Sequence, residues 1–381
     1  MNNNRFLFTI IQRASRLLGI ALLFSLSCCN KNIIPDNTIS IDIEDLSIVG
    51  YLDLFSKIEI IPLETNDESL LRSITKLYID EENGDLVVFD GSQRIGFCFD
   101  DKGLFKYSSS KMIGNGPGEY MHPDDFVYNP YHSTFEFLNP MGIISIYGNN
   151  MSFLRDIKIK SDNKLNAVHY FFPVNDDVYV LYNITDETTQ LYFYSLKNNS
   201  IIKNQPLGPR IPITFNSMPF YLFQDNCYFS SASLSDIEYQ IDPENFTLFP
   251  VMRIDYGNKT FPFKAKDYQD YDKSSSYAFP SERFQNNKFY FIYTTCHFQL
   301  YFTIYDKQTK TVRTCRNFSN KKAFPQIKYL TNDVMYFISN VENIQYTIDE
   351  RLLSEDDQDR LSKLKEDDNP IIVKAYFWVY S

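Results

Sequence analysis

The feature of this sequence that most restricts its fold is a strand-rich unit that recurs six times along the chain. Each unit places an apolar strand before a turn rich in Asn and Asp, and a second, strongly apolar strand after it. Asn, Asp and Gly tolerate the left-handed backbone conformations that tight turns require. A third aromatic strand and a short outer strand follow in the first five units. The six second strands are expected at Leu86–Phe89, Phe135–Leu138, Val178–Tyr182, Cys227–Phe229, Phe289–Tyr293 and Val334–Ile338.

The spacing of these strands identifies the kind of repeat. Their first residues are separated by 49, 43, 49, 62 and 45 positions. A period of about 40–50 residues with about four strands per unit is typical of β-propeller blades. The 33 Phe and 28 Tyr residues suit half-buried strands. We therefore expect an all-β protein with a single six-bladed β-propeller over residues 51–381. An open β-sandwich, or two sandwich domains, would explain the strands but not six similar units.

The sixth unit differs from the other five because it has no outer strand of its own. After Ile338 the chain enters a charged stretch, residues 349–368, with leucines at helical spacing, and Ile371–Trp378 then supplies the third strand. We expect one short helical insertion there. Ile58–Leu63, upstream of the first unit, can occupy the outer position. Such a closure would remove the free sheet edges that favour aggregation.

The N-terminus has the pattern of an export signal. Residues 1–27 contain three arginines before Leu17–Leu26, an apolar stretch that is too short to span a bilayer. A small residue and two cysteines follow, similar to the lipobox of bacterial lipoproteins. We expect a lipid anchor such as palmitate on Cys28, or alternatively on Cys29, and a tether over residues 28–50. This pattern predicts a protein of the cell envelope held in the outer membrane, on its periplasmic or its surface face. The alternative is ordinary secretion with incidental cysteines.

Charge and cysteine spacing exclude several classes of function. With 37 Lys and Arg against 48 Asp and Glu, the chain is acidic and has no dense basic stripe. A nucleic-acid partner is therefore not expected. The other four cysteines form no C-x-x-C pair, so zinc and thioredoxin-type sites are not indicated. Cys296 and Cys315 fall in one unit and a disulfide between them is conceivable, but small buried apolar side chains are expected for Cys98, Cys227, Cys296 and Cys315.

Three motifs together resemble a known family. They are Ile60–Thr65 (I-I-P-L-E-T), Ile113–Tyr120 (I-G-N-G-P-G-E-Y) and Leu364–Pro370 (L-K-E-D-D-N-P). In this order they are similar to motifs of the six-bladed β-propeller lipoproteins of gut anaerobic bacteria. The resemblance covers roughly residues 50–381 and implies the propeller fold and export. It implies no common activity and no catalytic residues.

Candidate chemistry is concentrated in one polar segment. Glu119, His122, Asp124 and Asp125 are a possible ligand or metal site, and the oxygen atoms of the three carboxylates would favour Ca²⁺ as the cofactor. The alternative is a solvated loop with a strand cap. The preceding glycines are a feature of phosphate loops, but no Lys-Ser/Thr follows, so a fixed crossing between blades is expected. His169 and Arg283 are expected on inner strands, which line propeller channels.

Two functions follow from these observations. The first is a membrane-anchored, non-catalytic binding or scaffold module for a protein or glycan partner. The alternative is a metal-dependent hydrolase or lyase whose site lies at the mouth of the central channel, built from side chains of several blades. Exposed rings would favour sugar or peptide binding, but in strands of period two most rings must fill the space between blades. The rings expected in the core are Tyr170, Phe171, Phe172, Tyr192, Phe193, Tyr194, Tyr221, Phe223, Tyr290 and Tyr301.

Overall fold

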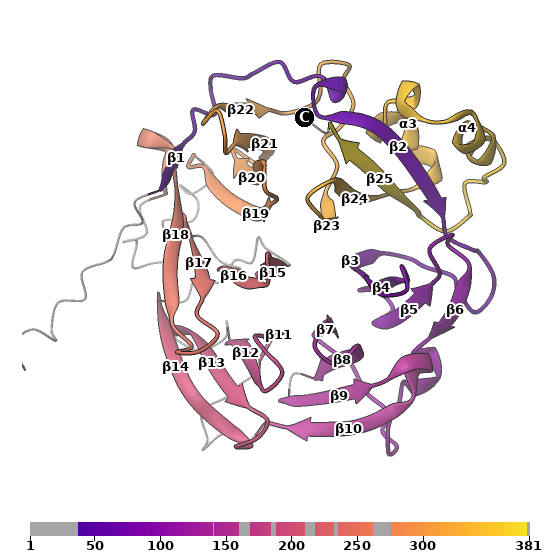
Figure 1. Cartoon of the computed structure of the whole chain (residues 1–381), viewed down its shortest axis with the longest axis vertical. Coiled ribbons are helices and arrows are strands. Elements are labelled where there is room, and N and C mark those ends of the chain that lie inside the picture. Colours follow the sequence, from indigo (N-terminus) through magenta and orange to yellow (C-terminus); the bar gives the residue numbers. More distant parts are fainter. Residues whose placement is uncertain are drawn as a thin grey trace, which may run out of the picture. The chain divides into compact units, whose positions relative to one another are not determined.

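The computed structural model describes residues 37–139, 141–159, 168–183, 188–209, 218–231, 235–261 and 276–378. Within these residues the strands form six small sheets that follow one another around a ring (Figure 1). The expected all-β fold, a six-bladed β-propeller, is confirmed, and the sandwich alternatives are excluded. Each sheet is one blade, and we number the blades in chain order.

Within each blade the four strands of the repeat pair antiparallel with their neighbours, and the first strand of each unit lies innermost (Figure 1). Blades 1 and 2 contain β3 (Ile74–Ile79), β4 (Leu86–Asp90), β5 (Ile95–Phe99), β6 (Phe105–Ser108), β7 (Asp125–Asn129), β8 (Thr134–Asn139), β9 (Ile143–Tyr147) and β10 (Phe153–Lys158). Blades 3 and 4 contain β11 (Tyr170–Pro173), β12 (Val178–Asn183), β13 (Thr188–Ser195), β14 (Ser200–Pro209), β15 (Phe220–Phe223), β16 (Asn226–Ser230), β17 (Ile237–Ile241) and β18 (Leu248–Asp255). Blade 5 contains β19 (Phe279–Gln285), β20 (Phe289–Cys296), β21 (Gln299–Asp306) and β22 (Val312–Cys315).

Sequence chemistry explains these strands and turns. The second strands are continuous apolar runs, and β4 and β12 are buried along their whole length because neighbouring blades cover both faces. In blades 1, 4 and 5 an aspartate closes the turn between the third and the outer strand. The carboxylates of Asp100, Asp242 and Asp306 each accept hydrogen bonds from backbone N–H groups two to four residues further on, at 2.8–3.1 Å. The repeat visible in the sequence is thus a repeat of burial and turn chemistry.

Blade 6 is closed by the N-terminal strand, as expected. It contains β23 (Ile327–Leu330), β24 (Val334–Ser339) and β25 (Ile371–Phe377), and β2 (Phe55–Pro62) pairs antiparallel with β25 in the outer position. Asn369 fixes this junction. Its side chain donates to the carbonyls of Glu64 and Ser69 at 2.7 and 2.8 Å and accepts from the Leu71 N–H at 2.8 Å. Two of the motifs that carried the family resemblance therefore meet at the closure.

The segment before β2 is more structured than a tether. Residues 28–50 are expected from the sequence to link the anchor to the domain, yet β1 (Thr38–Ser40) pairs parallel with β18 at the outer edge of blade 4. Ile39, Ile41 and Ile43 are buried in a cluster with residues of blades 4 and 5. Alternate isoleucines give this segment one apolar face, and burying that face outweighs the polar residues between them. Residues 37–50 thus belong to the domain.

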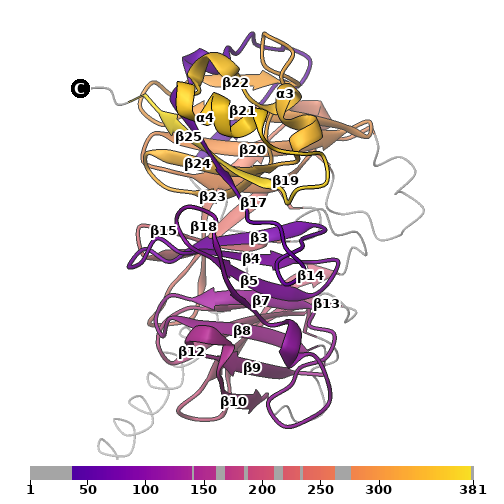
Figure 2. The same cartoon turned by 90° about the vertical axis from the view of Figure 1, so that its right-hand side faces the viewer.

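The helices are short and lie mainly in the insertion of blade 6. Helices α3 (Ile344–Thr347) and α4 (Glu355–Ser362) lie beside β24 and β25 (Figure 2), which confirms the expected helical insertion. The Ser354 hydroxyl caps α4 by accepting from the Asp357 N–H at 3.1 Å. Among the described residues no helix is both long and apolar enough to cross a bilayer. In the described part of the chain the single-turn 3-10 helices are η1 (Tyr51–Asp53), η2 (Ser110–Met112), η3 (Asn149–Met151), η4 (Gly257–Lys259), η6 (Val341–Asn343) and η7 (Glu350–Leu352).

The four cysteines of the domain are small core residues. Cys98, Cys227, Cys296 and Cys315 are all buried and all carry free thiols. The disulfide considered between Cys296 and Cys315 is not formed. Each thiol packs among apolar side chains, as expected for buried cysteine.

The closure gives a first test. Replacing Asn369 by alanine removes the three side-chain hydrogen bonds across the junction and leaves buried backbone groups unsatisfied. We expect the free energy of unfolding to fall by about 3 kcal/mol, measured by urea denaturation. Asn343→Ala is the matched control, because Asn343 is exposed and its side chain contacts the adjacent Glu342. Equal stability of the two variants would show that this junction does not hold the ring closed.

Candidate functional site

A cavity of about 740 Å³ lies where the innermost strands converge. Residues of β3, β7, β11, β15, β19 and β23 all line it, so every blade contributes to its wall. The turns that follow these strands also contribute residues, among them Asp80, Pro130, Asp225 and Asn332. Since these turns all follow inner strands, they surround one mouth of the channel. The cavity is therefore a product of the whole ring.

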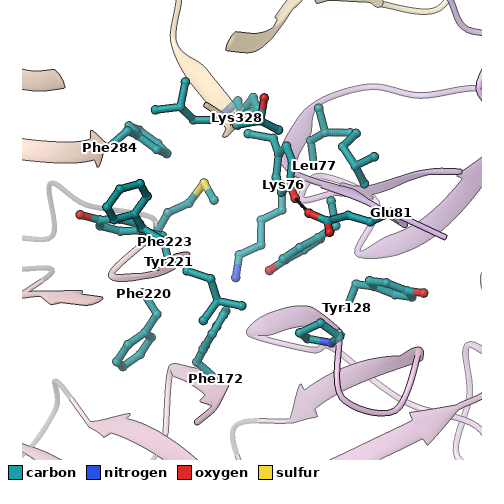
Figure 3. Close-up of a pocket in the computed structure, with 18 of the residues that line it drawn as sticks. Lys76, Leu77, Glu81, Tyr128, Phe172, Phe220, Tyr221, Phe223, Phe284 and Lys328 are labelled. Atoms are coloured by element: carbon teal, nitrogen blue, oxygen red, sulfur yellow. Dashed lines mark hydrogen bonds between the residues drawn. The ribbon is translucent and has the colours of Figure 1, made fainter. Parts of the chain in front are cut away.

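Aromatic side chains form much of this wall (Figure 3). Most of the rings that were expected in the core are indeed buried in the core, including Phe193, Tyr194 and Tyr290. Phe171, Phe172, Tyr221 and Phe223, however, line the cavity together with rings that the sequence analysis did not single out. Flat apolar rings with some hydroxyl groups suit the binding of a ligand with both apolar and polar faces. The aromatic lining consists of Tyr78, Tyr128, Tyr131, Phe171, Phe172, Phe220, Tyr221, Phe223, Phe284 and Tyr329.

A buried ion pair ties three blades together at the cavity. The ammonium of Lys76 on β3 extends into the centre of the cavity (Figure 3) and pairs with the Asp125 carboxylate on β7. Lys76 also donates to the Phe126 carbonyl at 3.1 Å, and Asp125 accepts from the Phe171 N–H of blade 3 at 3.1 Å. Burial alone lowers the pKa of Lys76, but attraction to Asp125 raises it above its usual value. Lys76 is therefore charged at neutral pH.

A second lysine lies on the neighbouring inner strand. Lys328 on β23 lines the cavity and is only 8% exposed. Its ammonium donates to the Thr75 carbonyl at 3.4 Å, one residue before Lys76. Burial lowers the pKa of Lys328 below its usual value, and attraction to Glu282 offsets this only in part. Two lysines of blades 6 and 1 thus share one side of the cavity.

Hydrogen bonds between blades 4 and 5 hold the opposite wall. The Tyr221 hydroxyl donates to Glu238 at 3.0 Å and accepts from the Gln285 amide at 3.0 Å. The Tyr290 hydroxyl of blade 5 donates to the same Glu238 carboxylate at 2.5 Å. Burial raises the pKa of Glu238, although attraction to Arg283 and the two tyrosine hydrogen bonds lower it in part. These contacts position Tyr221 as a rigid part of the wall.

The four residues that the sequence suggested as one ligand site have different partners in the structure. Asp125 reaches the cavity and pairs with Lys76, whereas Glu119 accepts from the Gly116 N–H at 2.7 Å within its own loop. His122 is exposed and Asp124 is half-buried. Among the described residues, no three His, Cys, Asp or Glu side chains are grouped so that they could hold a metal ion. A calcium site at these four residues stays a prediction.

The glycine-rich segment is a fixed crossing from blade 1 to blade 2. Ile113 and Tyr120 form a β-bridge, and the Tyr120 ring stacks on Phe137 with centroids 4.2 Å apart. Gly118 has φ +78°, which glycine adopts without strain. A Cβ on Gly114 would lie 2.0 Å from the Glu119 carboxylate. The glycines therefore serve close packing, as expected.

Arg283 and His169, the other two residues singled out from the sequence, make hydrogen bonds within the fold. Arg283 lies on β19 and donates to the carbonyls of Ile237 and Ser235, at 2.9 and 2.5 Å, which joins blades 5 and 4. His169 directly precedes β11 and its N–H donates to the Tyr182 carbonyl at 3.2 Å. Neither residue is among those that line the cavity.

The cavity lysines were missed, although the sequence contains a signal for them. In Thr75-Lys76-Leu77-Tyr78 and Ile327-Lys328-Tyr329-Leu330, a lone lysine interrupts an apolar inner strand. Such a lysine must be paired or must face a cavity, because burying an isolated ammonium is costly. The combination of position in the unit and charge would have identified both residues.

Comparison with known proteins agrees with this architecture. Residues 37–376 match the family model described as "Domain of unknown function (DUF4934)". The chain belongs to the DUF4934 family. No curated protein matches the sequence of this DUF4934 protein significantly.

Solved structures are similar to this DUF4934 protein at low sequence identity. A Bacteroides fragilis protein provisionally described as exported is 15% identical, with a TM-score of 0.70 over 91% of this chain and 100% of its own. A DUF4221 family member from Bacteroides vulgatus is 9% identical, with a TM-score of 0.48 over 85% of this chain and 98% of its own. The first similarity supports the fold, and the second is too weak to carry an argument.

The ion pair at the cavity gives a second test. Asp125→Asn leaves the buried Lys76 ammonium without its counter-charge, so we expect the free energy of unfolding to fall by about 3–5 kcal/mol at neutral pH. Adding Lys76→Met should restore most of that loss, because no unpaired charge then remains. Asp359→Asn is the control, since its pair with Lys363 is exposed and such pairs contribute little. Urea denaturation gives the free energy of unfolding of the parent and of the three variants. An Asp125→Asn variant of unchanged stability would contradict a buried ion pair.

Proposed function

We propose that this DUF4934 protein is a lipid-anchored, non-catalytic binding or scaffold module of the cell envelope, which takes part of a protein or glycan partner into its central cavity. The observation that supports this most is the cavity itself. It has the size typical of ligand pockets, aromatic walls and a few charged groups held in defined positions. Such an arrangement favours recognition of one ligand group with a defined orientation.

The way in which the charged groups are held also supports a binding role. Asp125 accepts hydrogen bonds from Lys76 and from the Phe126 and Phe171 N–H groups, and Glu238 accepts from two tyrosines. These contacts fix the wall before any ligand arrives, and a pre-organised wall lowers the cost of binding. The alternative function, a metal-dependent hydrolase or lyase at the same channel mouth, requires ligands from several blades. Stoichiometric Ca²⁺ or Zn²⁺ in the purified protein would favour that alternative.

Two observations support export and anchoring. The sequence places Ser27-Cys28-Cys29 directly after an apolar stretch. The structurally similar Bacteroides fragilis protein is described as exported. Both cysteines lie outside the described residues, and β1 begins at Thr38. A lipid on Cys28 would precede β1, which pairs with β18 at the outer edge of blade 4.

Binding in the cavity is tested by removing one ring. Arrays of oligosaccharides and peptides identify ligands that also raise the melting temperature of the full-length protein. Phe223→Ala should lower the affinity for these ligands about tenfold, the equivalent of about 1.4 kcal/mol of binding free energy, because Phe223 lines the cavity. Phe249→Ala is the control, since Phe249 is 52% exposed on the outer strand of blade 4. Ligands that bind both variants equally well would place the binding site elsewhere.

The anchor is tested by substitution of both cysteines. The Cys28→Ser, Cys29→Ser double variant should leave the membrane fraction and should no longer incorporate labelled palmitate, because neither acceptor sulfur remains. Single variants distinguish Cys28 from Cys29 as the modified residue. A double variant that still fractionates with membranes and still carries the label would rule out this anchor.

A further inference from the structure

We propose that the cavity binds the end of a saccharide chain that carries one carboxylate, and that this carboxylate lies against Lys328 and Lys76. The inference rests on the proposed binding function and names the chemistry of its ligand. It concerns a uronic acid, or another acidic sugar, at the terminus of the chain.

Positive charge in this part of the cavity exceeds the negative charge in contact with it. Lys76 has a carboxylate partner in Asp125. An ammonium has three donors, yet among the described residues the Lys328 ammonium makes one long hydrogen bond, 3.4 Å, to the Thr75 carbonyl. Glu282, which attracts Lys328 electrostatically, is itself buried and accepts from the Gln326 amide at 3.2 Å. Lys328 therefore retains donors for a ligand.

A carboxylate in the cavity would lie near Lys328, which borders the strand that carries Lys76. Lys328 bonds to Thr75, the residue next to Lys76, so their strands β23 and β3 lie side by side at this point. Burial makes the charge of Lys328 unfavourable in the empty cavity, and an incoming anion would compensate it. Charge-assisted hydrogen bonds are stronger than neutral ones, and more so where water is excluded. The lysine pair thus favours an anionic group over a neutral one.

The mouth of the cavity restricts how many charges the ligand carries. Asp80, Glu81, Glu82 and Asp225 line the turns at one mouth, and Glu81 and Glu82 are exposed. Lys76 on β3 precedes Asp80, in the turn after β3, by four residues, so it lies about 13 Å deeper at about 3.3 Å per residue. An acid at the tip of a chain can reach the lysines, while further acids along the chain would face the carboxylates at the mouth. A neutral chain with one acidic end fits this arrangement.

The wall favours a sugar over a peptide. Phe172, Phe220, Phe223 and Phe284 line the wall from blades 3, 4 and 5 (Figure 3), and the half-buried Phe223 ring leaves a surface against which the apolar face of a sugar can stack. The inner strands also turn their unpaired edges toward the channel, with N–H and C=O groups from six directions. Hydroxyl groups around a sugar can use donors and acceptors on all sides, whereas an extended peptide pairs with one strand edge.

The experiment compares the full-length protein with variants on an array of matched oligosaccharides, which end either in glucuronic or galacturonic acid or in the corresponding neutral sugar. An array of peptides with free carboxyl termini is measured in parallel. We expect acid-terminated saccharides to bind at least tenfold more tightly than their neutral counterparts. Lys328→Met should abolish this preference without lowering the melting temperature, because it removes a charge that burial disfavours. Lys197→Met, on the exposed β13–β14 turn, should behave as the parent.

The possible outcomes separate this inference from the proposed function. Neutral and acidic saccharides that bind equally, and both less well to Phe223→Ala, would overturn the acidic ligand but leave the binding function intact. Binding by peptides alone would overturn the saccharide, and an acid preference that survives Lys328→Met would overturn the role of Lys328. If Phe223→Ala changes the binding of no ligand on either array, the proposed cavity function fails, and this inference fails with it.

Discussion

The pairing of β2 with β25 is the constraint on which the rest of the structure depends. From Phe55 opposite Phe377 to Pro62 opposite Ile371, it joins the strand that precedes blade 1 to the last strand of blade 6. Without it, blade 6 would expose a strand edge, and the first and last blades would not be held in one sheet. The Asn369 side chain strengthens this junction, because it connects β25 to the segment that leads from β2 into blade 1.

The cavity is a consequence of that closure. Lys76 lies on the first inner strand and Lys328 on the last, and the ring makes these strands neighbours although the hydrogen bond from Lys328 to Thr75 spans 253 sequence positions. The ion pair of Lys76 with Asp125 and the tyrosine hydrogen bonds to Glu238 then hold adjoining blades at fixed positions. The same contacts that stabilise the ring therefore shape a wall suited to recognising one ligand group.

Sequence reasoning succeeded where the signal was local and repeated. The second strands, the outer position of Ile58–Leu63 and the helical insertion all follow from apolar periodicity and turn residues, which depend on neighbours in the chain. It was incomplete at residues 37–50, where alternation of Ile39, Ile41 and Ile43 is plain but the polar residues around them suggested a linker. It was also incomplete at the candidate site, because Glu119 and Asp125 are close in sequence yet have different partners in space.

By itself, the sequence determined a six-bladed propeller with its termini joined in one sheet, since six units of similar burial pattern have few other ways to cover their apolar faces. It also determined which rings belong to strands. Only the tertiary structure decided which of those rings face the channel and which fill the core, because both kinds alternate in strands of the same composition. It likewise decided that two distant lysines share one cavity, because contacts between blades depend on closure of the ring and leave no local trace in the chain.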